Sequence, residues 1–294
     1  MEKVMNKKQK KIVKKAKKIR SIIMMSLMCI MLLSAATYAW FTLSSTAKVS
    51  NLTMTVGEAN GLRVAMDSGS TPKESDWKPA ITFPDNAVKG VLVPATYDGS
   101  KFYRPEYNDD GEVDRVVNDN RVIELNTSNN DAKKEGHYYT LTFYMESLGE
   151  DANIRLVEGE NLSKDSRKGT YVIENKKGQK TEQNAAAAVR ISINAQDSDV
   201  SGIYEPNCDM EFSGTVTKAS TASGYSKKNY TTVQQKSDGT FVDGTSHSKA
   251  VFKLKADKPT LITLHIWIEG DDAQCVNQIQ MDNLIGQLYF EKQD

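Results

Sequence analysis

The stretch "HYYTLTFYMES", residues 137–147, alternates apolar and polar side chains along its whole length. Its apolar side chains fall on one face: Tyr139, Leu141, Phe143 and Met145. A strict two-residue period is typical of a β-strand with one buried face. The sequence therefore predicts a long strand here, with its apolar face in a core.

The same alternation recurs on both sides of this stretch. It is clear in "AVRISIN" (188–194), "TLITLHIWIEG" (260–270) and "LIGQLYFE" (284–291). Shorter runs predict six more strands, at 49–56, 61–66, 90–97, 121–125, 153–157 and 250–254. Helix candidates after residue 41 are few, and the helix-prone Ala run of "NAAAAVR" (184–190) merges into an alternating strand. Because no crossover helices separate the strands, we expect an all-β, antiparallel β-sandwich with a jelly-roll-like topology.

The strands are separated by polar insertions at 67–79, 98–120, 159–183 and 218–248, which we expect to form loops. No internal repeat and no boundary divides this part of the chain. A single β-sandwich ectodomain over residues 42–294 is the simplest organisation.

The N-terminus has a different composition. Residues 1–20 form a basic n-region with ten Lys and Arg residues, and the uncharged run "SIIMMSLMCIMLLSAATYAWF" (21–41) follows it. A helix over residues 21–41 would be about 31 Å long, which matches the hydrocarbon core of a bilayer. The positive-inside rule would keep the N-terminus cytoplasmic if this helix stays as an anchor.

Cleavage of this run is the alternative to anchoring. Its most apolar part, residues 22–33, has the length of a signal-peptide core, and small side chains precede a possible cut between Ala39 and Trp40. Both alternatives predict export to the cell surface or extracellular matrix. The membrane is then a partner through residues 21–41, at least before processing.

The formal net charge of zero combines a basic tail with an acidic body. The 274 residues after the n-region carry 28 basic and 37 acidic side chains. An acidic body argues against nucleic acid as a partner.

Two cysteines lie in the body, Cys208 and Cys275. An exported chain permits a disulfide between them, and two independent buried thiols are the alternative. Their spacing fits neither a CxxC redox motif nor a zinc cluster.

Motifs for enzymatic chemistry are missing. The three histidines, His137, His247 and His265, form no HExxH motif, and the chain has no GxSxG motif and no glycine-rich phosphate loop. We therefore expect no enzyme and no cofactor.

Calcium is the one weak metal candidate. In "EYNDDGEVDR" (106–115), Gly111 can take position 6 of a calcium loop, with candidate ligands Asp109, Asp110, Glu112 and Asp114. Val117 then stands at position 12, where an EF-hand needs Glu, so the stretch fails as an EF-hand. The acidic turn "WIEGDDAQC" (267–275) could also bind a cation, but a turn capped by Asp side chains is the preferred interpretation.

The N-terminal stretch "KKIRSIIMMSLMCIMLLSAATYAWFTLSSTAKVSNLTMTV" resembles that of the TasA/camelysin-like exported proteins of Firmicutes, which carry SipW-type signal peptides. The matching residues are Thr37, Tyr38, Ala39, Trp40 and Phe41. The segment "HIWIEGDDAQCVNQI" also resembles a segment of clostridial relatives. The resemblance covers about 40 residues, and the body shares only a β-rich, jelly-roll-like character. The resemblance implies cleavage after Ala39 and assembly into surface fibres of a biofilm matrix.

A mature chain beginning at Trp40 would expose an extended arm. Such an arm could add a strand to the sheet of a neighbouring molecule, and repetition of that contact makes a filament. The candidate arm residues are Trp40, Phe41, Leu43, Val49, Leu52, Met54 and Val56. Residues 49–56 could instead pair within their own domain.

We therefore expect an exported, non-enzymatic surface protein that forms a structural fibre or matrix subunit. The first alternative is a membrane-anchored jelly-roll module that binds a glycan or calcium. The second is a camelysin-type metalloprotease, which the lack of a zinc motif disfavours.

Overall fold

In the computed structural model the chain divides into two units, Met1–Ser44 and Ser45–Asp294. The structure describes residues 18, 20, 21, 24–26, 28, 47–57, 61–84, 87–107, 113–162, 166–174, 185–208, 230–242, 249–270, 272 and 282–293. In the first unit the described residues are helical, and the rest of the predicted 21–41 segment lies outside the described residues. No helix among the described residues combines the length and the apolarity that crossing a bilayer requires.

The second unit is built from β-strands, and its described strands form sheets of eight, seven and three strands. The eight-stranded sheet contains β1 (Ala47–Val56), β3 (Ala80–Phe83), β4 (Val91–Leu92), β9 (Glu135–Gly136), β11 (Ala152–Leu156), β12 (Tyr171–Glu174), β16 (Phe252–Leu254) and β18 (Asp282–Lys292). The seven-stranded sheet contains β2 (Leu62–Met66), β8 (Glu124–Leu125), β10 (Tyr138–Ser147), β13 (Val189–Ala195), β14 (Ser201–Glu205), β15 (Thr231–Gln234) and β17 (Thr260–Ile268). The three-stranded sheet is β5 (Thr96–Tyr97), β6 (Phe102–Tyr107) and β7 (Val113–Val117).

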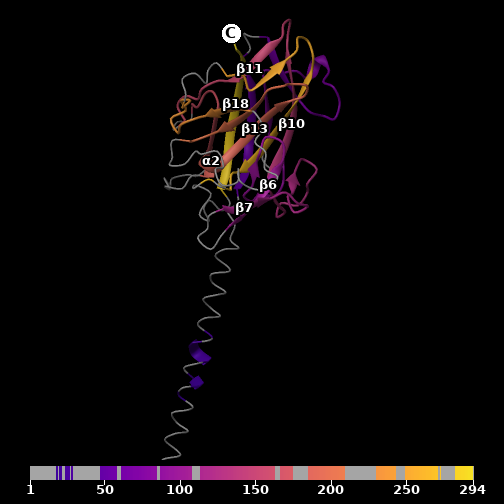
Figure 1. Ribbon diagram of the computed structural model, residues 1–294. Helices are drawn as coiled ribbons and strands as arrows, with labels where there is room; N and C mark the ends of the chain where they lie inside the picture. The colour runs from indigo at the N-terminus through magenta and orange to yellow at the C-terminus, as the bar shows by residue number, and fades with distance from the viewer. Residues whose placement is uncertain are drawn as a thin grey trace, which may run out of the picture. The chain divides into compact units, whose positions relative to one another are not determined.

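The described helical elements of this unit are short. They are the 3-10 turn η2 (Glu74–Asp76) and the single turn α2 (Ala185–Ala188), which leads directly into β13 (Figure 1). The prediction of an all-β fold, including the Ala run that merges into a strand, is therefore confirmed.

The two large sheets share one core. Alternate residues of β10 and β17 point into it, and four of the β17 residues are fully buried: Ile262, Leu264, Ile266 and Ile268. The rings of Phe143 on β10 and Phe290 on β18 lie 6.3 Å apart between centroids, so side chains from both sheets meet. Burial of one face of each sheet is the physical cause of the alternation in the sequence.

Most of the described strand pairs are antiparallel, as predicted, but the sheets are mixed. Among the described strands four pairs are parallel: β1 with β18, β4 with β9, β8 with β10, and β14 with β15. Parallel neighbours need a long connection between them, and β1 and β18 are joined by nearly the whole second unit. Strand direction therefore could not be read from local alternation.

A second, smaller core lies on the outer side of the seven-stranded sheet. Its buried members are Ala95, Tyr97, Phe102, Ile203 and Trp267. Trp267 alternates with the inward-facing residues of β17, so it points away from the main core, yet it is only 1 % exposed. Residues of β5 and β6 cover this face of the sheet, which is why it is not uniformly polar.

Gly169 marks a close approach between two backbone segments just before β12. It has φ +71, and a Cβ added there would overlap the carbonyl oxygen of Glu158. We expect Gly169→Ala to lower the free energy of unfolding by at least about 2 kcal/mol, because strain and overlap act together. Urea denaturation measures this loss.

Gly69→Ala is the matched control for Gly169→Ala. Gly69 has φ +82, but an added Cβ would meet nothing within 4 Å. Strain alone should cost about 1 kcal/mol there. Equal losses at the two glycines would contradict a role for the backbone contact at Gly169.

Candidate functional site

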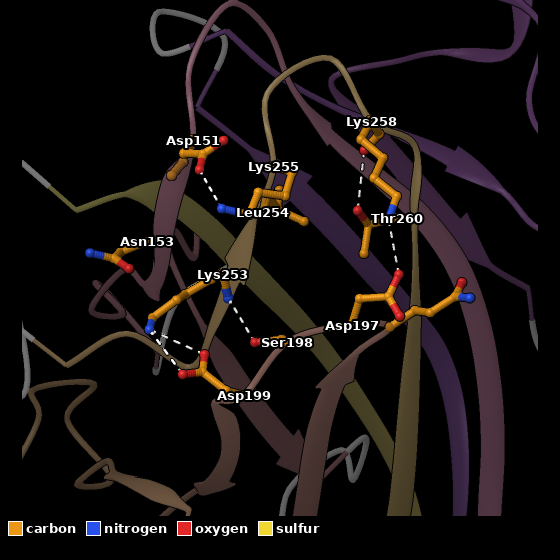
Figure 2. Close-up of a pocket in the computed structure, with 12 residues that line it drawn as sticks. Asp151, Asn153, Asp197, Ser198, Asp199, Lys253, Leu254, Lys255, Lys258 and Thr260 are labelled. Atoms are coloured by element: carbon orange, nitrogen blue, oxygen red, sulfur yellow. Dashed lines mark hydrogen bonds and ion pairs between the residues drawn. The ribbon is translucent and has the colours of Figure 1, made fainter.

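Three neighbouring loops form a charged pocket of about 470 Å³. They are the start of β11, the turn between β13 and β14, and the segment that joins β16 to β17 (Figure 2). The charged pocket is lined by Asp151, Ala152, Asn153, Gln196, Asp197, Ser198, Asp199, Lys253, Leu254, Lys255, Lys258 and Thr260.

Each lysine of the charged pocket pairs with an aspartate from another loop (Figure 2). The Nζ–Oδ distances are 2.6 Å for Lys255 and Asp151, and 2.9 Å for Lys258 and Asp197. The hydrogen bond from Lys255 lowers the pKa of Asp151, and the same bond raises the pKa of Lys255. The Lys253 ammonium likewise lowers the pKa of Asp199.

These pairs limit what the charged pocket can bind. Its cations and anions are already matched, so a charged ligand would have to displace an existing partner. No aromatic side chain lines it, and surface ion pairs of this kind are weak and sensitive to salt. Their clearest role is to hold the three loops together.

A second, aromatic pocket of about 350 Å³ lies over the outer face of β10 and β17. The aromatic pocket is lined by Tyr97, Ser100, Lys101, Phe102, Asn118, Asp119, Val122, Tyr138 and His265. Its rings are stacked. Phe102 lies 3.8 Å from Tyr138 and 4.5 Å from Tyr97 between ring centroids, with interplanar angles of 9° and 26°.

Burial is the main cause of the lowered pKa values of His265 and His137. His265 is half-buried, its Nδ1 lies 3.2 Å from Thr140 Oγ1, and burial lowers its pKa. His137 is 6 % exposed, and its Nδ1 accepts a hydrogen bond from the backbone N–H of Ile123 at 3.0 Å. Burial, together with the Arg104 charge, lowers the pKa of His137 to about 4. Both rings are therefore neutral at neutral pH.

The neutral His137 predicts a pH-dependent stability. Between pH 6.5 and about 4 the unfolded chain binds a proton at His137 that the folded chain does not. Stability present above pH 6.5 is therefore lost as the pH falls through this window, by roughly 2 kcal/mol once partial solvation is allowed for.

Urea denaturation at about pH 4.5 and about pH 7.5 measures this slope. We expect His137→Gln to reduce the slope, because Gln can accept the Ile123 hydrogen bond but does not titrate. A smaller slope of the same sign should remain, because burial also lowers the pKa of His265. An unchanged slope in His137→Gln would contradict the assignment.

The acidic turn after β17 folds inward onto a buried cation. Asp272 Oδ2 accepts a hydrogen bond from Arg190 Nη2 at 2.6 Å, and Glu269 Oε2 accepts one from Trp267 Nε1 at 3.0 Å. Glu205 Oε1 lies 3.6 Å from Arg190 Nε. We call Arg190, Glu205, Glu269 and Asp272 the buried ion cluster. Burial opposes the charge of Arg190, but these carboxylates raise its pKa.

The candidate arm residues fall into two groups. Trp40, Phe41 and Leu43 lie outside the described residues, as does the predicted cleavage point between Ala39 and Trp40. Val49 lies in β1 and pairs with Leu284 of β18. Leu52, Met54 and Val56 follow it in β1, and their side chains are buried in the chain's own core at 2 %, 0 % and 2 % exposure.

The other candidate sites are only partly described. Asp109, Asp110 and Glu112 lie outside the described residues, and Asp114 is exposed on β7. Cys208 is buried after β14, but Cys275 lies outside the described residues, so the disulfide stays a prediction. Among the described residues, no group of three or more His, Cys, Asp or Glu side chains is arranged to hold a metal ion.

The aromatic pocket was hard to predict from the sequence. Tyr97, Phe102, Tyr138 and His265 come from four separate strands, and β6 lies inside a stretch predicted to be a loop. The available signal was that Tyr138 and His265 occupy the non-core face of two long alternating strands. Comparisons with family models, curated proteins and solved structures find no match for this chain.

Proposed function

We propose that this chain is an exported, non-enzymatic surface protein whose jelly-roll-like sandwich serves as a fibre or matrix subunit. In this proposal residues 21–41 direct export. The arm that begins at Trp40 then inserts its strand β1 into the sheet of a neighbouring molecule. The position of β1 carries the proposal. β1 is the first described strand after the N-terminal unit in the sequence, and it lies in the interior of the eight-stranded sheet.

Strand β1 completes the eight-stranded sheet from the inside. It pairs with β18 on one side and with β3 and β4 on the other. A sheet that lost β1 would present two unpaired inner edges and an open core. Strand β1 of another molecule would pair with both edges and fill the open core, because an identical copy of the lost strand fits best.

Connectivity favours such an exchange. β1 begins at Ala47, directly after the boundary between the two units at Ser44. Its parallel partner β18 is the last strand of the chain, so no short hairpin ties β1 to it. The head-to-tail contact that results is heterologous and open, which is the geometry of a filament.

A pair of introduced cysteines tests the exchange. Thr53 and Gln287 are directly opposed on β1 and β18, so a Thr53→Cys and Gln287→Cys chain can form a disulfide across this pair. The chain's own cysteines are replaced by alanine. Oxidised assemblies should give a covalent ladder on a non-reducing gel, because each bond joins two molecules.

The matched control places the cysteines at Thr142 and Thr263, which are opposed on β10 and β17. That pair should form its bond within one molecule in every state. A Thr53–Gln287 bond that stays within one molecule in assembled material would overturn strand exchange.

The N-terminus of the protein recovered from cells tests the export part of the proposal. Intact mass and N-terminal sequencing should show a chain that begins at Trp40. A chain that retains its Lys-rich start would instead support the membrane-anchored binding module.

A further inference from the structure

We infer that the aromatic pocket is a binding site for a pyranose ring of a polysaccharide. This inference goes beyond the fibre proposal and does not depend on it, because the pocket belongs to a single ectodomain. It assigns a ligand class to the pocket-facing surface of Tyr138, His265 and Lys101. Tyr138 and His265 pack on the second core, but neither ring is fully buried by it, and Lys101 is exposed.

The floor of the aromatic pocket is built from rings that pack on one another. Phe102 is held between Tyr97 and Tyr138, and the ring of Trp267 meets the Phe102 ring nearly edge-on, at 79° and 5.4 Å. Phe102 and Trp267 are almost fully buried, whereas Tyr138 and His265 line the pocket and are only partly buried. A preformed aromatic surface costs little entropy when it binds a ligand.

The polar rim is also fixed in place. The carboxylate of Asp98 accepts hydrogen bonds from the backbone N–H groups of Ser100 and Lys101, at 2.8 and 2.7 Å, and from Tyr103 at 2.8 Å. These bonds set the turn between β5 and β6. Asn118, which also lines the pocket, donates a hydrogen bond from Nδ2 to the carbonyl oxygen of Phe102 at 2.7 Å.

The rim offers hydrogen-bonding groups to a ligand. Thr140 occupies Nδ1 of His265, which leaves Nε2 as the ring nitrogen that can meet a ligand. Ser100 supplies a hydroxyl and Lys101 an exposed ammonium. Asp119 is held by Arg121 at 2.6 Å, so its carboxylate lies beside a cation rather than alone.

A sugar ring matches this combination of surfaces. The axial C–H groups of a pyranose form an apolar face that packs on an aromatic ring, and its equatorial hydroxyls form a polar edge. Sites for small ligands join an apolar floor to a few placed polar groups in the same way. The charged pocket has polar groups but no ring, and is therefore the poorer candidate.

Isothermal titration calorimetry on the full-length chain tests the inference. The chain is held in a sugar-free detergent, and the probes are cellohexaose, chitohexaose and hexagalacturonate. We expect saturable binding of at least one probe. Tyr138→Ala should weaken that binding about tenfold or more, because it removes a partly buried ring that lines the pocket.

Tyr144→Ala is the matched control. Tyr144 is a half-buried tyrosine on the same face of β10, six positions from Tyr138, and it does not line the aromatic pocket. Its substitution should change affinity less than twofold. Lys101→Met is a second test variant at an exposed position, and it should weaken binding about threefold or more even if Tyr138→Ala fails to fold.

Failure of all three probes to bind would overturn the inference. Binding that Tyr138→Ala or Lys101→Met does not weaken more than Tyr144→Ala would also overturn it. The cysteine-pair experiment measures strand exchange and the calorimetry measures sugar binding. Failure of either proposal therefore leaves the other intact.

Discussion

Arg190→Met is expected to lower the free energy of unfolding by about 3–5 kcal/mol, the range for removal of one partner from a buried ion pair. The Arg190 side chain is 3 % exposed, and the side chain of its partner Asp272 is 0 % exposed. Removal of the guanidinium leaves carboxylates buried without their main cation. Methionine has a similar length, so the loss should not come from a cavity.

The backbone adds to the effect of this substitution. Arg190 also donates hydrogen bonds to the carbonyl oxygens of Ala187 and Val189, where α2 passes into β13. Those carbonyls lie at the end of a single helical turn and need donors. Urea denaturation at neutral pH should show the loss as a lower midpoint.

The control for Arg190→Met is Lys255→Met in the charged pocket. The ion pair of Lys255 with Asp151 has similar length, 2.6 Å, but its side chains are 75 % and 60 % exposed. Its removal should leave the midpoint almost unchanged, because water replaces the lost partner. A neutralised triple variant, Arg190→Met with Asp272→Asn and Glu205→Gln, should recover part of the loss. Equal effects of Arg190→Met and Lys255→Met would contradict the role assigned to burial.

The inner faces of the sheets were predictable, and the outer faces were not. Tyr139 and Phe143 were assigned to a core from their spacing alone, and both are buried. Arg190 and Ser192 lie on the opposite face of β13, where alternation predicts solvent, yet they are 3 % and 1 % exposed. Their cover comes from the distant β5–β6 segment and the turn after β17, and local periodicity carries no information about such long-range packing.

Some strands were missed because they lie in stretches expected to be loops: β12 lies in 159–183, β15 in 218–248, and β6 and β7 in 98–120. The sequence of β6 and β7 is rich in charge and includes Pro105. Proline is tolerated here because β5 pairs with β6 only at Phe102 and Tyr103, so among the described strands Pro105 has a partner on one side alone, in β7. Arg104 and Arg115 both pair with Glu106. The charged side chains that suggested a solvated loop therefore form ion pairs within β6 and between β6 and β7.

The pairing partner of the candidate arm could not be predicted from local sequence either. The sequence indicated that residues 49–56 form a strand, and alternation could not decide whether its partner lies in the same chain. The structure places β1 between β18 and β3 of its own chain. A donated strand would need this same register in a neighbour, since a shift of one residue would turn Leu52, Met54 and Val56 away from the core.

Removal of β1 is expected to abolish folding of the isolated second unit. A chain of residues 57–294 lacks three core side chains, each worth about 1.5–3 kcal/mol of burial, and the hydrogen bonds of both flanking ladders. A typical domain is stable by only about 5–15 kcal/mol. Circular dichroism and thermal denaturation should show no cooperative transition for the truncated chain.

A peptide of residues 45–57 should restore that transition when it is added in excess during refolding. The peptide supplies Leu52, Met54 and Val56 to the open core and pairs with β18 in the register Met54 to Leu288. A peptide with Met54→Asp is the control, and it should fail because it brings a charge to a fully buried position. Rescue by the native peptide alone would mean that the strand can be delivered by another molecule. A truncated chain that folds unaided would contradict both the energetic role of β1 and the filament contact built on it.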